Sequence, residues 1–240
     1  MFPLLDQLFS NPLEFLEGML YRIPAVLIAL TMHEWAHGFV AYKLGDPTAK
    51  FMGRLTINPL KHLDPIGAAM LFFLGFGYAK PVPVNPNHFT RKYRDDFLVS
   101  IAGITMNLLL YLFFFTAYFF LTSYIRNNAY IQNTVWQIDL SDFWVAVLPP
   151  LIQLMQSIFM INLSIAIFNL IPVPPLDGFH VLNDLILKGN LFARQQIAQV
   201  GMVLLLVLSF TGKLGDWVLA PVAGAVLDGT FWLFGVVFGV

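Results

Sequence analysis

Long apolar runs separated by short polar loops dominate the hydrophobic pattern of the chain. A helix needs about 20 apolar residues to cross the hydrocarbon core of a bilayer. Three runs reach that length, and they occupy residues 23–44, 97–124 and 143–171. Residues 197–210 form a shorter run, and residues 217–240 carry Asp228 and Gly229 near their middle, which predicts either one span or two short segments. We therefore expect an all-α polytopic membrane protein with about five to six transmembrane helices.

Two segments after the first run predict other structures. Residues 65–78 are apolar but too short to cross, which favours a re-entrant or interfacial segment. Residues 50–60, KFMGRLTINPL, mix β-branched and apolar residues around Gly53, which indicates a small β-sheet or hairpin. The free edge of such a strand, at Gly53 and Leu55, could bind an extended peptide. A hairpin that packs on the membrane surface without touching a substrate is an equal alternative.

Lysine and arginine gather in the loops on one side of the expected spans. Residues 41–63 and residues 80–96 carry four of them each, whereas residues 125–142 carry only Arg126. Short loops rich in lysine and arginine remain on the cytoplasmic side of a membrane. We therefore expect both basic loops to lie on the cytoplasmic side, together with the end of the first span, which the first of these loops follows.

The composition is typical of a membrane protein, and it limits the partners and metal ligands that the protein can have. Of the 240 residues, 58% are hydrophobic and 11% are charged, and the mean hydropathy is +0.72. A net charge of −1 with scattered basic residues gives no basic stripe for a phosphate backbone, so we expect no nucleic-acid partner. The chain has no cysteine, so a metal ion would need histidine or carboxylate ligands.

The first span contains an ionisable motif, HEWAH, at residues 33–37. His33 and His37 are four residues apart, so on a helix their rings project from one face and could bind one metal ion. Glu34 beside them completes H-E-x-x-H, in which zinc activates a water molecule and the glutamate takes its proton. The alternative is that these side chains only form hydrogen bonds with neighbouring helices, but ionisable groups at membrane depth are usually functional.

A tetrahedral catalytic zinc site needs a third protein ligand. Asp177 is our first candidate, because Pro172, Pro174 and Pro175 end the third span and Gly178 permits a sharp return of the chain. The residues alone support equally well a role for Asp177 as an N-cap of the segment that follows. Weaker ligand candidates are His180 and His62, whereas His88, in a basic polar loop, is expected to be solvated.

Two asparagines lie in apolar runs, where an unsatisfied amide is costly. We expect Asn107 and Asn169 to face the interior of the helix bundle. Either side chain could orient a substrate, and Asn107 could donate to the oxyanion that forms during attack on a carbonyl. Structural hydrogen bonds between helices are an equal alternative for both.

The chain resembles the site-2 protease family of intramembrane zinc metalloproteases through HEWAH and through NLIPVPPLDG at residues 169–178. The similarity runs from about Pro24 to Leu182, and it includes GRLTINPLKHLDPIG, KPVPVNP and AGITMN. In the last of these, Ile104 replaces the usual proline of the family. The resemblance implies a small sheet after the first span. It also implies the roles of the site residues, with zinc bound by His33, His37 and Asp177 and catalysis by Glu34.

The resemblance implies an endopeptidase that cleaves transmembrane or signal-peptide-like substrates with zinc-activated water, near the cytoplasmic face of a bacterial cell membrane. We expect one membrane-embedded domain over residues 1–240, with a catalytic core at about 20–185 and C-terminal helices at about 190–240. No loop is long enough to fold alone as a PDZ or CBS module. The alternatives are a membrane metal-binding or transport protein with the same cluster, and a catalytically silent relative, against which Glu34 argues. The oligomeric state is open.

Overall fold

The computed structural model describes residues 3–74, 78–135, 142–185 and 195–239 of the chain. Its elements are helical throughout these ranges. In chain order they are α1 (Pro3–Ser10), α2 (Pro12–Lys43), α3 (Thr48–Phe51), the 3-10 turn η1 (Pro59–Lys61), α4 (Pro65–Leu74), the 3-10 turn η2 (Pro86–His88), α5 (Lys92–Val135), α6 (Asp142–Leu170), α7 (Asp177–Leu185), α8 (Gln195–Phe210), the π-helical turn η3 (Gly215–Leu219) and α9 (Ala220–Phe238).

Four stretches of the described residues are long and apolar enough to cross a membrane. The three long runs of the sequence lie in α2, α5 and α6, as expected. Residues 215–238 form one further continuous stretch through η3 and α9, which favours one span over two short segments. The helix α8 is apolar but has only 16 residues. The part of the chain that the structure describes therefore contains four helices that could span a membrane, and the expected count of five to six is not confirmed there.

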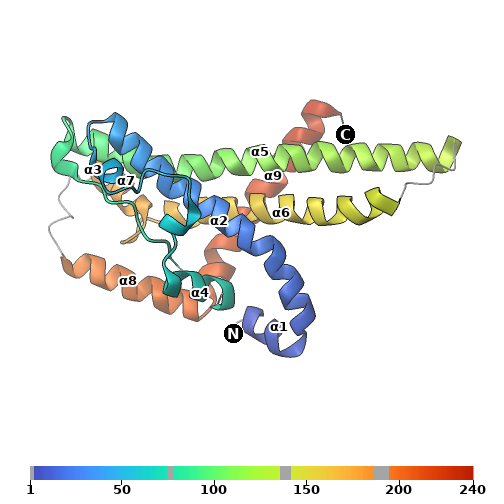
Figure 1. Cartoon of the computed structure of the whole chain (residues 1–240), viewed down its shortest axis with the longest axis horizontal. Coiled ribbons are helices and arrows are strands. Elements are labelled where there is room, and N and C mark those ends of the chain that lie inside the picture. Colours follow the sequence, from blue (N-terminus) through green and yellow to red (C-terminus); the bar gives the residue numbers. More distant parts are fainter. Residues whose placement is uncertain (1–2, 75–77, 136–141, 186–194, 240) are drawn as a thin grey trace.

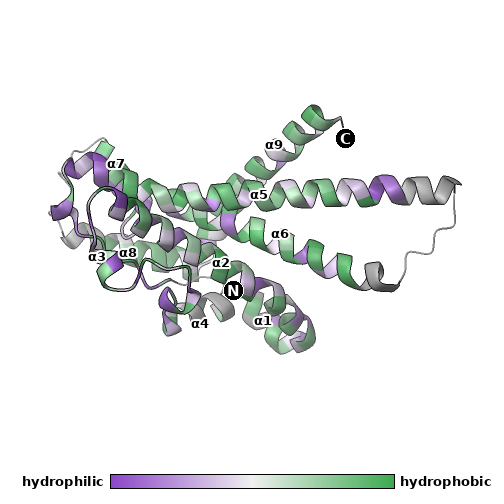
Figure 2. Ribbon diagram, turned by 45° about the horizontal axis from the view of Figure 1, so that its top comes forward, coloured by the Kyte–Doolittle hydropathy of each residue, from purple (hydrophilic) through white to green (hydrophobic). Residues whose placement is uncertain are grey.

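Figure 1 shows α5 and α6 side by side along the long axis of the molecule, with α2 packed against both. Their contact is aromatic and aliphatic, and α9 joins it through Ala223. The buried side chains of this core are Tyr111, Phe115, Phe119, Phe159, Leu163, Ile167 and Ala223. In Figure 2 the bundle is largely hydrophobic, and hydrophilic residues gather at the end that carries α3 and α7. The polar end of the bundle therefore adjoins the end of α2 that holds the HEWAH motif.

The helix α2 begins eleven residues before the apolar run that predicted it. Asn11 caps it, because its Oδ1 accepts the backbone N–H of Glu14 at 3.4 Å, and Pro12 is suited to the first helical position. Pro24 lies inside the helix without ending it, which membrane helices tolerate. An apolar run predicts which residues cross the membrane, whereas the capping residue determines where the helix begins.

The expected small β-sheet is not confirmed in the described residues. Their one β-pairing is an isolated antiparallel bridge between Leu63 and Ala79. Local side-chain hydrogen bonds favour helical turns here instead. Asp46 Oδ1 accepts the N–H of Thr48 just before α3, and Asn58 caps η1, because its Oδ1 accepts the N–H of Leu60. Such local hydrogen bonds compete with strand pairing.

Candidate metal centre

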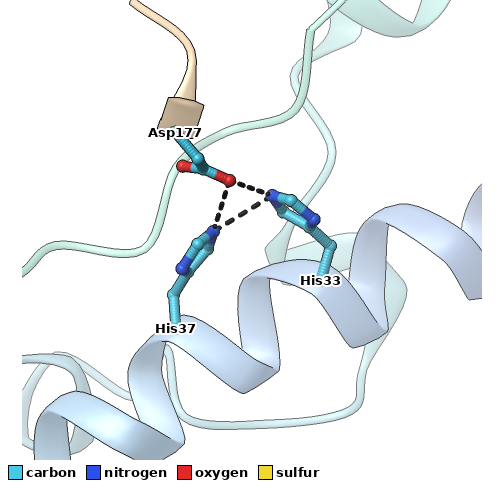
Figure 3. Close-up of side chains that lie close together, drawn as sticks. All are labelled: His33, His37 and Asp177. Atoms are coloured by element: carbon cyan, nitrogen blue, oxygen red, sulfur yellow. Dashed lines mark hydrogen bonds and ion pairs between the residues drawn. The ribbon is translucent and has the colours of Figure 1, made fainter. Parts of the chain in front are cut away.

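Three side chains from two distant segments converge at the polar end of the bundle (Figure 3). His33 and His37 project from one face of α2, as their spacing predicts, and Asp177 stands at the first residue of α7. Asp177 Oδ2 lies 3.1 Å from His33 Nε2 and 3.3 Å from His37 Nε2, and the two Nε2 atoms are 3.0 Å apart. The fold therefore brings together the three residues that the sequence proposed as ligands.

The hydrogen bonds on the far side of each ring decide which nitrogen carries a proton. His37 Nδ1 lies 2.7 Å from the backbone oxygen of Val99, and His33 Nδ1 lies 2.6 Å from Asn107 Oδ1. Both partners are acceptors, so each Nδ1 donates and each Nε2 of a neutral ring offers a lone pair. Three acceptor atoms then face one another.

This arrangement fits a divalent cation. Asp177 Oδ2 is buried and has no hydrogen-bond partner. The free-energy cost of burying this carboxylate oxygen is therefore not compensated unless a cation binds to it. Ligands of a tetrahedral zinc ion with bonds of about 2.0–2.1 Å are about 3.3 Å apart, close to the separations here. The donor set of two imidazoles and one carboxylate suits zinc, and three ligands leave a fourth position for water.

Two glycines allow these side chains to approach. A Cβ atom at Gly103 of α5 would lie 2.5 Å from His37 Nε2 and 2.6 Å from His33 Cε1, so α5 can pass the rings only without a side chain. A Cβ atom at Gly178 would overlap the carbonyl oxygen of Leu170 at the end of α6. Gly178 therefore serves close packing of α7 on α6. The Oδ2 atom of Asp177 caps no helix, because it accepts no hydrogen bond.

Asn107 faces the bundle interior, as expected, and its side-chain amide forms hydrogen bonds with other groups of the protein. Its Oδ1 accepts from His33, while its Nδ2 donates to the backbone oxygen of Ala29 at 3.1 Å and to Asn162 Oδ1 at 2.8 Å. Asn162 was not among the predicted site residues, although an amide within the apolar run of α6 indicates a buried hydrogen bond. Asn169 lies elsewhere on α6 and donates to the backbone oxygen of Ile165 at 3.1 Å.

Glu34 is buried and makes one backbone contact. Its Oε2 accepts the N–H of Val82 at 2.7 Å, across a separation of 48 residues. On a helix Glu34 lies about 60° around the axis from His37, so its carboxylate and the imidazole share a side of α2. Apart from the KPVPVNP segment itself, no feature of the sequence pointed to the contact between Glu34 and Val82.

The other candidate residues lie outside the three-residue cluster. His62 Nε2 lies 2.7 Å from the backbone oxygen of Thr56, and His180 Nδ1 lies 3.7 Å from Asp96 Oδ2. His88 was expected to be only solvated, but its Nδ1 lies 2.7 Å from Asp46 Oδ1, because η2 packs against the buried Asp46. Gly53, with φ of +63°, and Leu55 belong to the turn after α3.

Asp46 joins the loop after α2 to the segment before η2. Burial alone would raise the pKa of this carboxyl, but the hydrogen bonds it accepts from Asn85, Thr48 and His88 outweigh burial and lower the pKa. The backbone N–H of Asn85 lies 2.7 Å from Asp46 Oδ2. An ionised Asp46 therefore holds the polar end of the bundle together beside the metal centre.

Comparisons with known proteins agree with this geometry. "Putative zinc metalloprotease YwhC" of Bacillus subtilis is 38% identical over 235 residues, which cover 98% of each chain. "Putative zinc metalloprotease Rip2" of Mycobacterium tuberculosis is 28% identical over 93% of this chain and 76% of its own length. The Rip2 protein of Mycolicibacterium smegmatis is 25% identical over 86% of this chain and 73% of its own. No solved structure matches the chain.

The family comparison covers the metal centre itself. The sequence model of peptidase family M50 matches residues 21–208, a range that contains both histidines of α2 and the aspartate of α7. The similarity to YwhC extends over nearly the whole chain. The chain therefore belongs to peptidase family M50, the site-2 protease family of zinc metalloproteases.

Proposed function

We propose that the protein is an intramembrane zinc endopeptidase, which hydrolyses peptide bonds of transmembrane or signal-peptide-like substrates near the cytoplasmic face of a bacterial cell membrane. The observation that carries this proposal is the convergence of three acceptor atoms within 3.3 Å of one another. Two of them belong to α2, a helix long and apolar enough to span a bilayer, and the third belongs to Asp177 at the start of α7. Ionisable groups buried within a span are rare and are usually functional, and three acceptor atoms that face one another favour a bound cation. The names of the relatives point to the same chemistry.

His33, His37 and Asp177 would hold the metal ion. Zinc bound there supplies a Lewis acid that polarises the substrate carbonyl and lowers the pKa of a bound water to about 7. Glu34 is the general base, and its Oε1 accepts the proton of the attacking water while Val82 holds Oε2. Glu34 then passes this proton to the amine that leaves when the peptide bond breaks.

Asn107 is a positioning residue in this scheme. Its carbonyl oxygen fixes the ring of His33, and both of its N–H groups are directed at acceptors within the protein. A hydrogen bond from a ligand's second nitrogen sets the orientation and basicity of the imidazole. We therefore assign Asn107 to the metal centre and no longer to substrate or oxyanion binding.

The distribution of charge supports the proposed orientation. The basic loops of residues 41–63 and 80–96 adjoin α3 and the start of α5, and Figure 1 shows both at the end of the molecule that carries α7. Residues 125–135 lie at the far end of α5, and they contain only one basic residue. The basic end is the cytoplasmic one by the positive-inside rule, so cleavage takes place near that face.

A transport function is the alternative, and the arrangement of ionisable groups argues against it. A path for ions through a membrane needs several polar sites along its length. In the ranges that the structure describes, a single group of histidine and carboxylate side chains could hold a metal ion. The glutamate beside that group has a use in hydrolysis and none in simple metal binding.

The test compares wild type with Glu34→Gln in liposomes. The probe is a synthetic peptide with one apolar segment of about 20 residues and a fluorophore and quencher around its cytoplasmic half. Wild type should cleave the probe, and Glu34→Gln should retain one zinc ion per chain and lose cleavage. Cleavage by Glu34→Gln, or zinc loss from it, would contradict the role of Glu34. Failure of wild type to cleave the probe would contradict the substrate class.

A further inference from the structure

An extended segment, residues 79–85 with the sequence AKPVPVN, crosses α2 at Glu34. Val82, at its centre, is 7% exposed, and Glu34 is 8% exposed. One turn along α2, Gly38 leaves room for this crossing, because a Cβ atom there would lie 3.1 Å from Val82 Cγ1. The segment is therefore packed directly on the helix at the proposed general base.

The sequence of the segment presents a single amide to Glu34. Pro81 and Pro83 flank Val82, and a proline has no backbone N–H to donate. Their rings also restrict the backbone and keep the segment extended. The N–H of Val82 is thus the one donor in this three-residue stretch, and it points at Glu34 Oε2 at 2.7 Å.

Arg54 holds the segment from the other side. One of its terminal nitrogens, Nη2, donates to the backbone oxygen of Lys80 at 2.8 Å and to that of Pro81 at 3.2 Å. The Pro81 oxygen and the Val82 N–H belong to one planar trans peptide, so they point in opposite directions. A group that fixes the Pro81 oxygen therefore fixes the direction of the Val82 N–H.

The burial of Arg54 shows that this contact is not a solvated surface interaction. Arg54 is only 9% exposed, and its Nε is buried with no hydrogen-bond partner. Burial of a guanidinium is costly unless hydrogen bonds compensate for lost water. The hydrogen bonds from Arg54 to the carbonyl oxygens of Lys80 and Pro81 compensate for part of this cost. Both acceptors belong to the residues immediately before Val82.

We infer that Arg54 is a positioning residue for Glu34, which acts through the peptide plane between Pro81 and Val82. Arg54 holds the plane, the Val82 N–H holds Glu34 Oε2, and the carboxylate keeps the orientation that proton transfer at Oε1 requires. This inference rests on the proposed function, in which Glu34 is the general base. A misplacement of about 1 Å in such a group can reduce a rate about 100-fold.

The first test removes the donors of Arg54. Arg54→Met keeps much of the aliphatic stem and loses both hydrogen bonds, so kcat for the liposome-reconstituted probe should fall about 10- to 100-fold. The KM and the zinc content should stay within about twofold of wild type, because neither metal ligand nor substrate is touched. Arg94→Met, which changes an exposed arginine in the first turn of α5, is the control and should retain wild-type kcat.

The second test removes the amide itself. Val82→Pro deletes the N–H and should lower kcat to the same degree, whereas Val82→Ala keeps the N–H and should lower kcat less than about threefold. In Arg54→Met/Val82→Pro the two losses should not multiply, since both act through one hydrogen bond. If Arg54 only stabilised the fold, the losses in kcat from the two substitutions would multiply in the double variant.

The outcomes separate this inference from the proposed function. Wild-type kcat in Arg54→Met, a raised KM alone, lost zinc, or multiplied losses in the double variant would overturn the role of Arg54. Activity in Glu34→Gln would overturn the proposed function whatever Arg54 does. If Arg54→Met is not recovered folded, Arg54→Lys, which keeps a cation and a shorter reach, takes its place and should show reduced kcat with zinc retained. Full kcat in Arg54→Lys would contradict the inference.

Discussion

Asn107 Oδ1 lies 2.6 Å from His33 Nδ1, and this contact joins α5 to α2 through the imidazole of a metal-site histidine. The same amide reaches α6, because its Nδ2 donates to Asn162 at 2.8 Å. The three longest helices of the bundle therefore meet at one buried side chain behind the metal centre. Zinc affinity should depend on this contact, although Asn107 is not itself a ligand.

Asn107→Leu removes the acceptor for His33 and keeps a side chain of similar size. Zinc affinity should fall about 10- to 100-fold, the usual effect of losing a group that orients a ligand. Chelator competition with the purified protein measures this change. Asn169→Leu, which changes an asparagine of α6 outside the cluster, should leave zinc affinity within about threefold of wild type. Equal losses in the two variants would count against the role of Asn107.

Gly103→Ala should disrupt the metal centre through steric overlap. Its Cβ atom would lie 2.5 Å from His37 Nε2, so an imidazole or the whole of α5 must move. Elemental analysis should find zinc reduced to well below one ion per chain. Gly224→Ala in α9 is the matched control, because nothing lies within 4 Å of the Cβ atom it adds. Full zinc content in Gly103→Ala would show that the rings are packed more loosely than this structure has them.

Local periodicity made the metal-site histidines predictable. His33 and His37 share a face because they are one helical turn apart, which requires no knowledge of the rest of the fold. The three long apolar helices were predictable for a similar reason, since the length of each apolar run by itself indicates that it can cross a bilayer. Asp177 was a weaker prediction, because the residues alone allowed a capping role as well as a ligand role, and only the fold shows its oxygen beside both rings.

The contacts between distant segments were not predictable. Nothing in the sequence connects Val82 with Glu34, 48 residues away, or selects Asn162 as the partner of Asn107. The expected sheet is not confirmed because strand propensity is a weak preference that local caps such as that of Asn58 override.

Asp184 predicts a pH dependence of stability. Burial, together with the neighbouring Asp96 carboxyl, raises the pKa of Asp184 from 3.8 to about 7. The folded state therefore holds a proton that the unfolded chain releases, so the contribution to stability is complete below about pH 4 and declines as the pH rises through 7. The Nδ1 atom of His180 lies 3.7 Å from Asp96 Oδ2, so this ring also faces the Asp96 carboxyl.

Asp184→Asn should remove this decline, because an amide does not ionise. The fall in Tm between pH 5 and pH 8, measured by thermal unfolding in detergent, should be smaller in Asp184→Asn than in wild type. Glu17→Gln, an exposed change in α2 before its apolar run begins, should leave the fall in Tm as it is in wild type. An identical fall in Asp184→Asn and wild type would show that Asp184 ionises normally in the folded protein.

We propose that one zinc ion is bound by imidazoles of α2 and by the carboxylate that begins α7. The most direct test of this claim is the zinc affinity of Asp177→Ala, measured by chelator competition beside wild type and Asp184→Asn, which changes a carboxyl of the same helix. We predict about one zinc ion per chain in wild type, nearly unchanged affinity in Asp184→Asn, and a loss of at least about 100-fold in Asp177→Ala. Wild-type affinity in Asp177→Ala would contradict the claim.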